Sequence, residues 1–427
     1  MRTIILTIFA VCLVMPSWSQ TAKEEIKKNA CLSASNFLAY PGPQKALTPA
    51  PKGLKPFYIS HYGRHGSRYM TSRRDYDYAY FALQRADSLG KLTELGKDVL
   101  HRLALIRDET EGRFGELTPL GARQHKEIAR RMFERFPEVF ADGATVDARS
   151  TVVIRCILSM SNALHQLLTL NPKLKVSQDA SVSDMYYMNQ EDKELWAGKT
   201  VPAAAYPYDD FCRRHDRSAG LMARLFNDTA YVNHRVNATR LNSCLFTVAS
   251  NVQNTELRKR LTFYDIYTDE ELYHNWLIDN ARSYIGYGGS KLTQSLQPFS
   301  QRNLLRRIIE EADSCIKLGQ PCASLRFGHE TIVMPLVCLL GLNNFDLQMD
   351  DLEQLDRKGW RNYRIFPMAA NLQFVFYRKD AQDTDVMVKV LLNEDEAKLP
   401  IKSNMEPYYR WRDLRDYYLK KLAEYQD

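Results

Sequence analysis

The sequence has no Cys-x-x-Cys pair, no tract of lysine and arginine, and no internal repeat or low-complexity segment. The missing cysteine pairs argue against a zinc ribbon or a dithiol redox site. Lysine and arginine number 58 against 51 aspartates and glutamates, which gives a formal net charge of +7. This modest excess does not fit a nucleic-acid binder, but it suits an enzyme with an anionic substrate.

Beyond the N-terminus the sequence also lacks an apolar run long enough to cross a bilayer. The N-terminus itself has Arg2, an apolar run over residues 4–15 and small residues up to Ser19. This pattern predicts a signal peptide over residues 1–19. We therefore expect a secreted protein, and the short signal without an endoplasmic-reticulum retention tail favours the bacterial periplasm. Cys12 lies within the apolar run and leaves a lipid anchor open.

Of the eight cysteines, all but Cys12 lie in the expected mature chain, which leaves seven. Export permits disulfides. Cys315 and Cys322 flank a turn-like Gly-Gln-Pro and are a candidate pair. An odd count leaves at least one thiol without an intrachain partner, and the full pairing stays open.

Short apolar stretches and amphipathic stretches alternate along the mature chain. Strands are predicted over residues 57–61, 145–148, 323–327, 371–377 and 385–392. Helices are predicted over residues 76–89, 92–107, 155–167, 209–227, 269–284, 331–340 and 408–425, and one more beginning at Thr118 and Pro119. This order indicates an α/β fold, with a mixed β-sheet flanked by helices.

The stretch over residues 172–300 is different, because it is rich in aromatic and helical signals and has few clear strands. We expect it to form a mostly α-helical insertion or cap domain. Residues 20–171 and 301–427 would then build the α/β core.

The most informative stretch is Ser-His-Tyr-Gly-Arg-His-Gly-Ser-Arg-Tyr-Met-Thr over residues 60–71, which follows a predicted strand. Arg64 and Arg68 bracket His65 and Gly66. A neutral imidazole has a free lone pair and can act as a nucleophile. Guanidinium groups bind phosphate oxygens in a planar, charge-assisted fork. A nucleophile between two anion-binding groups is what phosphoryl transfer requires.

Two further strand ends carry unusual polar residues, namely Arg149-Ser150-Thr151 with Arg155, and His329-Glu330. In an open α/β sheet, ligands bind beyond the carboxyl ends of the strands. All three junctions could therefore meet, and together they would supply a nucleophile, several cations and a carboxyl acid.

These motifs resemble the histidine acid phosphatase family (histidine phosphatase superfamily, branch 2). Its Arg-His-Gly-x-Arg-x-Pro signature is matched from Arg64 to Arg68, with Met70 in place of the proline and Thr71 matching the threonine that often follows. Its Leu-Thr-x-x-Gly-x-x-Gln element is matched over residues 117–124, and its Arg-Ser-Thr-x-x-x-Arg element over residues 149–155.

The family's C-terminal His-Asp is replaced here by His329-Glu330. A glutamate donor resembles the multiple inositol polyphosphate phosphatase and phytase branch, although that branch often has an alanine between the two residues. The missing alanine leaves the placement of the acid open, and the missing proline leaves the rigidity of the loop open.

The resemblance implies that His65 is the nucleophile and forms a phosphohistidine. It further implies that Arg64, Arg68, Arg155 and Thr71 bind phosphate with His329. Glu330 would then be the proton donor. A guanidinium cluster can replace a metal, so we expect no metal and no other cofactor.

The expected substrate is a polyphosphorylated small molecule such as phytate or lower inositol phosphates, and we expect a monomer that binds neither nucleic acid nor a membrane. Candidate rim cations form a pool in the insertion: Lys193, Lys199, Arg213, Arg214, Arg217 and Arg224. Alternatives are a broad-specificity acid phosphatase or glucose-1-phosphatase on the same scaffold, a mutase, and a non-catalytic phosphate-ligand-binding protein. The order of phosphate removal cannot be read from the sequence.

Overall fold

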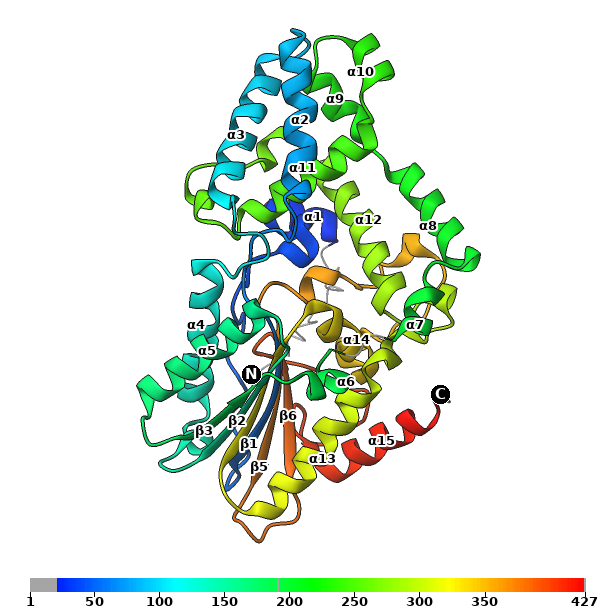
Figure 1. Ribbon diagram of the computed structural model, residues 1–427. Coiled ribbons are helices and arrows are strands. Elements are labelled where there is room, and N and C mark those ends of the chain that lie inside the picture. Colours follow the sequence, from blue (N-terminus) through cyan, green and yellow to red (C-terminus); the bar gives the residue numbers. More distant parts are fainter. Residues whose placement is uncertain (1–20, 190–191, 426–427) are drawn as a thin grey trace, which may run out of the picture.

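The structure is a computed structural model that describes residues 21–189 and 192–425, so the expected signal peptide lies outside the described residues. A mixed β-sheet with helices on both faces forms one end of the molecule, and a helical part lies beyond the ends of the strands, at the top of the view (Figure 1). The predicted fold class is confirmed. Within the described residues, no helix is both long and apolar enough to cross a membrane.

The main sheet has the strand order β3-β2-β4-β1-β5-β6-β7, with β8 paired to β6. The first four strands in this order run parallel, and β5 joins β1 antiparallel. The bounds are β1 Lys55–Arg64, β2 Thr145–Ser150, β3 Lys175–Asp179, β4 Cys322–Gly328, β5 Asn371–Arg378, β6 Met387–Leu392, β7 Asp395–Glu396 and β8 Tyr409–Arg410. All five predicted strands are present.

Strand β3 was not predicted, and it lies inside residues 172–300, which the sequence assigns to the helical insertion. It pairs in parallel with β2 at the edge of the sheet. Only Val176 of its five residues packs on the core, while the others are polar and exposed. An edge strand with so little buried apolar surface leaves a weak hydrophobic signal.

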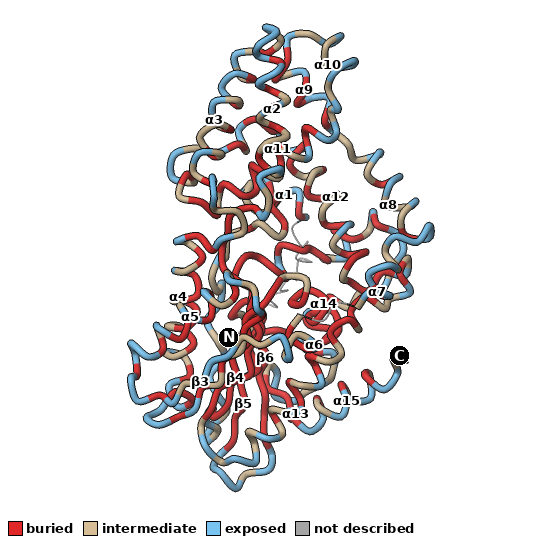
Figure 2. The backbone as a smooth tube through the Cα atoms, in the orientation of Figure 1, coloured by how far each residue is buried: buried red, intermediate tan, exposed pale blue. Residues whose placement is uncertain are grey.

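Apolar side chains cover both faces of the sheet, because successive residues of a strand point to opposite sides. Ile59 faces a core made with α4 Pro119–Arg135 and α5 Ile154–Leu170. Tyr58 faces a larger core that includes the helices of the other face. Those helices are α13 Arg302–Leu318, α14 Glu330–Leu340 and α15 Trp411–Ala423. Figure 2 shows the strands buried between these two layers.

The helical part does not match residues 172–300 alone. Helices α2 Arg74–Ser88 and α3 Glu94–Thr110, which the sequence places with the sheet, pack against α11 Ala238–Val252 and α9 Ser218–Leu225 (Figure 1). The apolar core of the helical part is continuous with the core on one face of the sheet. The division into two units remains a proposal, and these contacts favour placing α2 and α3 in the helical part.

The helix predicted over residues 209–227 is interrupted. Helix α8 Pro202–His215 ends before Asp216, whose backbone is extended and whose carboxylate accepts a hydrogen bond from Ser218 N at 2.8 Å. The extended backbone at Asp216 breaks the run, and its side chain satisfies the N–H of the first residue of α9. The other described helices are α1 Ala22–Lys28, α6 Met185–Met188, α7 Lys193–Gly198, α10 Thr229–Arg235 and α12 Asp269–Tyr287.

Helix α4 begins as predicted, with Thr118 as its N-cap and Pro119 as its first residue. Its first turn holds the loop that follows β1. Thr118 Oγ1 donates to Ser67 O at 3.1 Å, and Ser67 N donates to Gln124 Oε1 at 2.8 Å. Gly121 lies against the same loop, since a Cβ there would overlap the Ser67 carbonyl and lie 2.8 Å from Ser67 N.

We therefore expect Gly121→Ala to lower the free energy of unfolding by about 1–3 kcal/mol, the usual cost of overpacking against backbone that cannot move aside. Gly286→Ala is the matched control, because it lies in a helix with no atom within 4 Å of the added Cβ. Alanine there should be neutral or slightly stabilising. Equal unfolding midpoints in urea for the two variants would contradict the close packing of α4 on the loop.

Candidate functional site

The site lies at the carboxyl ends of three parallel strands. Arg64, at the end of β1, is in register with Gly328 at the end of β4, and Ser150 of β2 is in register with Phe327. The backbone continues the pairing one residue further, because His65 N donates to Gly328 O at 2.8 Å. Since α5 and α14 also begin here, the positive ends of two helix dipoles lie at the site.

His65 is fully buried, and its orientation is set by its own backbone. Nδ1 lies 2.9 Å from Gly66 O, which can only accept, so Nδ1 carries the proton. Nε2 then keeps its lone pair, and among the described residues it makes no hydrogen bond. Burial holds the pKa of His65 well below its usual value, with Arg64 adding to the effect. The imidazole is therefore neutral, with a free lone pair on Nε2.

The Arg64 guanidinium is also fully buried, and two backbone carbonyls orient it. Its Nη1 donates to Asn36 O at 2.6 Å and to Phe366 O at 2.8 Å. Its Nε lies 3.1 Å from Glu330 Oε2. Burial lowers the pKa of Arg64 to about 10, with Glu330 opposing, so the group stays charged near neutral pH.

Arg68 and Arg155 bring two more guanidinium groups to the site. Arg68 is buried, donates from Nη1 to Tyr69 O at 3.0 Å, and has a lowered pKa because of burial. Arg155, in the first turn of α5, is partly exposed. Thr71 is exposed, and its methyl group and Arg155 Nη1 lie within 3.8 Å of the place where a Cβ on Gly115 would sit.

His329 and Glu330 stand at the start of α14 and reach the same place. His329 Nε2 lies 3.2 Å from Thr151 Oγ1, and the His329 and His65 rings are 5.7 Å apart. Burial lowers the pKa of His329 to about 4. Glu330 Oε2 lies 3.6 Å from His65 Nε2, so the carboxyl reaches His65 although no alanine separates His329 from Glu330.

Glu330 experiences two opposing effects. Burial raises the pKa of its carboxyl, but the positive charges of Arg64 and Arg68 outweigh burial and hold the pKa well below its usual range. The carboxyl is therefore ionised near neutral pH in this arrangement.

Several buried polar atoms of the site make no hydrogen bond within the described part of the chain. They are Nε and Nη2 of Arg64, Nε2 of His65, Nε of Arg68, Nε of Arg155 and Oε2 of Glu330. Buried donors in proteins are almost always satisfied. Guanidinium donors without an acceptor, gathered around one imidazole, are the chemistry of an oxyanion-binding site.

The loop is held rigid without the proline of the family signature. Met70 N donates to Tyr76 Oη at 2.9 Å, a hydrogen bond that proline could not make. Tyr76 Oη in turn donates to Asn251 Oδ1 at 3.1 Å, and Asn251 Nδ2 donates to Arg68 O at 3.1 Å. The helical part thus supplies the rigidity left open by the sequence.

Two neighbouring cavities adjoin the site and share Asn36, Asp279 and Arg282 in their walls. The first, of about 520 Å³, is lined by Glu330, and the second, of about 410 Å³, by Arg68. Sequence reasoning missed the shared residues. Arg282 lies on an amphipathic helix where any solvated charge gives the same pattern, and Asn36 lies in η1 Ala30–Phe37, a 3₁₀ segment without periodicity.

Of the predicted pool of rim cations, Lys199 lines the first cavity, with its ammonium 4.1 Å from the centre of the Trp196 ring. The others line neither cavity. Arg213 and Arg214 pair with Asp210, and Arg224 pairs with Glu271. The remaining two members of the pool are Lys193 and Arg217. Arg149, from the second motif, also lies outside the cluster and pairs with Asp147 and Asp179.

A metal ion could find ligand atoms here, because one atom each of His65, His329 and Glu330 lies within 4.8 Å of the others. The guanidinium groups of Arg64 and Arg68 face the same atoms and repel a cation. The expected metal independence stays a prediction.

Every described cysteine is a free thiol. Cys315 and Cys322, the candidate disulfide pair, hydrogen-bond to one another. Their pairing also stays a prediction.

Comparison with known families agrees with the fold. Residues 63–393 match the family model described as the histidine phosphatase superfamily, branch 2. The match covers most of the chain, and the chain belongs to this family.

A curated relative, multiple inositol polyphosphate phosphatase 1 of Gallus gallus, is 25% identical over 398 residues, which cover 88% of this chain and 84% of that protein. Among solved structures, the multiple inositol polyphosphate phosphatase of Bifidobacterium longum in complex with inositol hexasulfate has a TM-score of 0.75 at 19% identity. The alignment covers 90% of this chain and 97% of that one. The phytase from D. castellii has a TM-score of 0.72 at 16% identity, with 96% and 89% covered.

The buried histidines predict how stability depends on pH. Burial lowers the pKa to about 3 for His61 and about 4 for His125 and His329, and well below the usual value for His65. In the unfolded chain each would bind a proton near pH 6.5. The unfolded state thus binds more protons below pH 6.5, so we expect the free energy of unfolding to fall from pH 7 to 5. Each such proton contributes up to about 1.4 kcal/mol per pH unit.

Urea unfolding at pH 5, 6 and 7 measures this slope. His125→Gln removes one of these groups and should make the slope shallower by close to one proton. Glu330 does not confuse the test, because a carboxyl with a depressed pKa loses its contribution only below its usual value of 4.5. A slope that is flat, or that rises toward pH 5, would contradict the neutral buried histidines.

Proposed function

We propose that the protein is a phosphomonoester hydrolase that removes phosphates from inositol polyphosphates such as phytate through a phosphohistidine intermediate. One observation carries the proposal. A buried, neutral imidazole presents Nε2 to unsatisfied guanidinium donors, with a carboxyl oxygen 3.6 Å away. The family membership and the relatives named above support the same activity.

In the first step His65 Nε2 attacks phosphorus, and the bond from phosphorus to the ester oxygen breaks. The Nδ1–H bond to Gly66 O holds the ring in the tautomer that leaves Nε2 free. Arg64, Arg68 and Arg155, with His329 and Thr71, bind the phosphoryl oxygens and stabilise the charge that develops on them.

Glu330 donates a proton to the leaving alkoxide, and then accepts one from the water that attacks the phosphohistidine. The carboxyl must be protonated for the first task. A phosphate ester entering beside Arg64 adds negative charge and so raises the pKa of Glu330. We accordingly propose an activity optimum on the acidic to neutral side.

The substrate class follows from the cavities. A simple ester needs only the pocket around His65, whereas a ring with several phosphates can reach Lys199 and Arg282 in the neighbouring walls. Arg282 pairs with Asp279 at 2.8 Å, and its side chain is 67% exposed, so it can contact a ligand in either cavity. Both cations add to the attraction for a polyanion.

We further propose that the protein is exported, with the bacterial periplasm as its compartment, and that it acts as a monomer. The apolar run over residues 4–15 supports export.

We expect His65→Ala to lower phosphate release from phytate by at least about 10³-fold, because the nucleophile is lost. Excess EDTA should leave wild-type release unchanged, because the guanidinium groups bind the phosphate. His101→Ala, which removes an exposed histidine of α3, is the control and should behave as wild type.

Phosphate release from phytate and from p-nitrophenyl phosphate, measured side by side, separates the alternatives. Release from the simple ester alone would retain the mechanism but refute the substrate class. No release from either substrate would favour the non-catalytic binding protein, and loss with EDTA would refute metal independence.

We expect Arg282→Ala to raise KM for phytate by about 5- to 10-fold and to leave kcat on p-nitrophenyl phosphate unchanged, because only the larger substrate reaches this group. Arg213→Ala is matched to it in charge and exposure but lines neither cavity, and it pairs with Asp210 instead. Steady-state kinetics on both substrates would contradict this role if the two arginine variants shifted KM for phytate equally.

A further inference from the structure

Residues 364–371, which we call the strap, hold the backbone of the nucleophile loop. Arg64 N donates to Ala370 O at 2.8 Å, and Ala369 N donates to His65 O at 3.0 Å. The strap thus holds both residues by their backbone, in addition to accepting a hydrogen bond from the Arg64 guanidinium. A shift of the strap would move the nucleophile and one arginine together.

The strap has a strained backbone, and the turn between β6 and β7 holds it in that conformation. Ala369 has a φ of +57°, in the left-handed region that is unfavourable for a residue with a Cβ. Asn393 Nδ2 donates to Arg364 O at 3.1 Å, and Asn393 Oδ1 accepts from Asn371 N at 3.1 Å. Both ends of the strap therefore depend on the turn between β6 and β7.

The two-residue turn between β6 and β7 has a glutamate at a position where glycine would adopt the backbone conformation with less strain. Asn393 and Glu394 have φ values of +54° and +70°, the backbone of a hairpin turn that usually has glycine in its second position. A strained glutamate at such a position is usually retained because its side chain makes contacts that glycine could not make.

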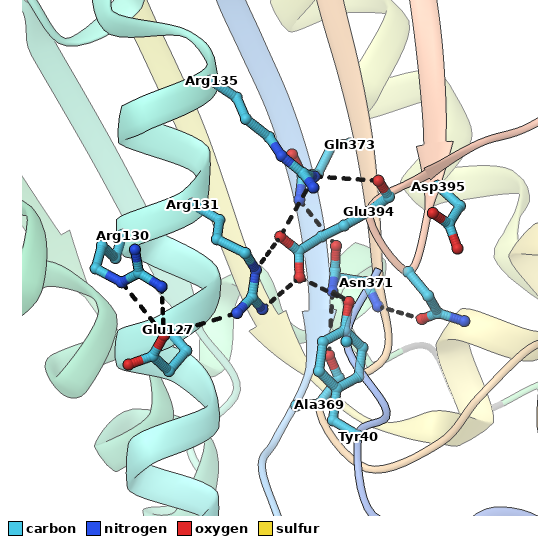
Figure 3. Close-up of polar contacts among 12 residues, drawn as sticks. Tyr40, Glu127, Arg130, Arg131, Arg135, Ala369, Asn371, Gln373, Glu394 and Asp395 are labelled. Carbon is cyan, nitrogen blue, oxygen red and sulfur yellow. Dashed lines mark hydrogen bonds and ion pairs between the residues drawn. The ribbon is translucent and has the colours of Figure 1, made fainter. Parts of the chain in front are cut away.

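The Glu394 carboxylate is buried, with 1% of its side chain exposed, and the side chains of Arg131, Tyr40 and Arg135 surround it (Figure 3). Arg131 donates from Nε at 2.9 Å and from Nη2 at 2.7 Å, and Tyr40 Oη donates at 2.9 Å. Arg135 Nη1 lies 3.6 Å from the carboxylate and donates to Glu394 O at 3.2 Å. Tyr40 Oη in turn accepts from Asn371 Nδ2 at 3.1 Å, which joins the carboxylate to the strap.

Arg131 and Arg135 lie on α4, the helix whose first turn holds Ser67 through Thr118 and Gln124. The nucleophile loop therefore has two supports, the start of α4 on one side and the strap on the other. Glu394 connects α4 to the strap, and it lines neither of the two cavities.

We propose that Glu394 is a positioning residue for His65 and Arg64, acting through the ion pair with Arg131 and the hydrogen bonds through Tyr40 to the strap. This inference rests on the proposed function for its kinetic readout. A displacement of about 1 Å in the attacking group can cost up to about 100-fold in rate, so a distant group can matter for catalysis.

Glu394→Gln should lower kcat on p-nitrophenyl phosphate by about 10-fold or more, and should weaken binding of inorganic phosphate, because Arg64 is displaced. Glu396→Gln is the matched control. Glu396 lies two residues further along, pairs with Lys389 at 3.0 Å and also contacts Thr48, but among the described residues it makes no hydrogen bond or ion pair with the strap. The Glu396→Gln variant should have a lower melting temperature, but below that temperature its kcat and its affinity for phosphate should be near those of the wild type.

Tyr40→Phe keeps the ion pair but cuts the link to Asn371, and it serves if Glu394→Gln does not fold. It should lower kcat by about 3-fold with little change in melting temperature, and Glu394→Asp should recover part of the loss in Glu394→Gln.

Equal kcat losses in the Glu394 and Glu396 variants, or a Tyr40→Phe enzyme with wild-type kcat, would overturn the inference. A wild-type protein that binds phosphate without turnover would refute the proposed hydrolase, and phosphate affinity would still test Glu394.

Discussion

Guanidinium groups are crowded around one neutral imidazole at the end of a sheet, and the rest of the structure has to tolerate that crowding. Arg64 is fully buried, Arg68 lies close by, and Glu330 is the carboxylate that faces both. Buried like charges repel strongly, so such a site needs neutral dipoles to hold each group in place. Backbone carbonyls of Asn36 and Phe366 do this for Arg64, and the resulting field favours an incoming anion.

This requirement gives the helical part a direct role in holding the loop after β1. Asn251 of α11 accepts from Tyr76 of α2 and donates to the backbone of Arg68, so helices far along the chain brace the loop. The same part contributes α12, whose Arg282 lines both cavities. Under the proposed function, chemistry and ligand selection are separate in the fold. The strand ends would carry the reacting groups and the helices the cavity walls, so an arginine in a wall could change without disturbing His65.

The sequence could predict what depends on local pattern. Five strands, the N-cap at Thr118 and the convergence of Arg64 and Glu330 follow from hydrophobic runs and from the rule that strand ends meet. Other features depend on contacts between distant segments. Strand β3 is too exposed to show a pattern. The exchange of a proline for Met70 is understood only once Tyr76 is seen to accept its N–H. Glu394 gives no signal at all, because its importance comes from neighbours more than 200 residues away, such as Arg131.

The pairing of Arg64 with Glu330 links binding of the anion to binding of a proton. In the present arrangement the arginine holds the pKa of the carboxyl well below its usual range, and an acid in that state cannot protonate a leaving group. A phosphate dianion competes for the same guanidinium and adds negative charge beside the carboxyl, which raises the affinity of Glu330 for a proton. By linkage, a protonated Glu330 must then raise the affinity for the dianion by the same factor. Glu330 would then be protonated only when the ester is bound. One arginine would both bind the substrate and set the protonation state of the proton donor.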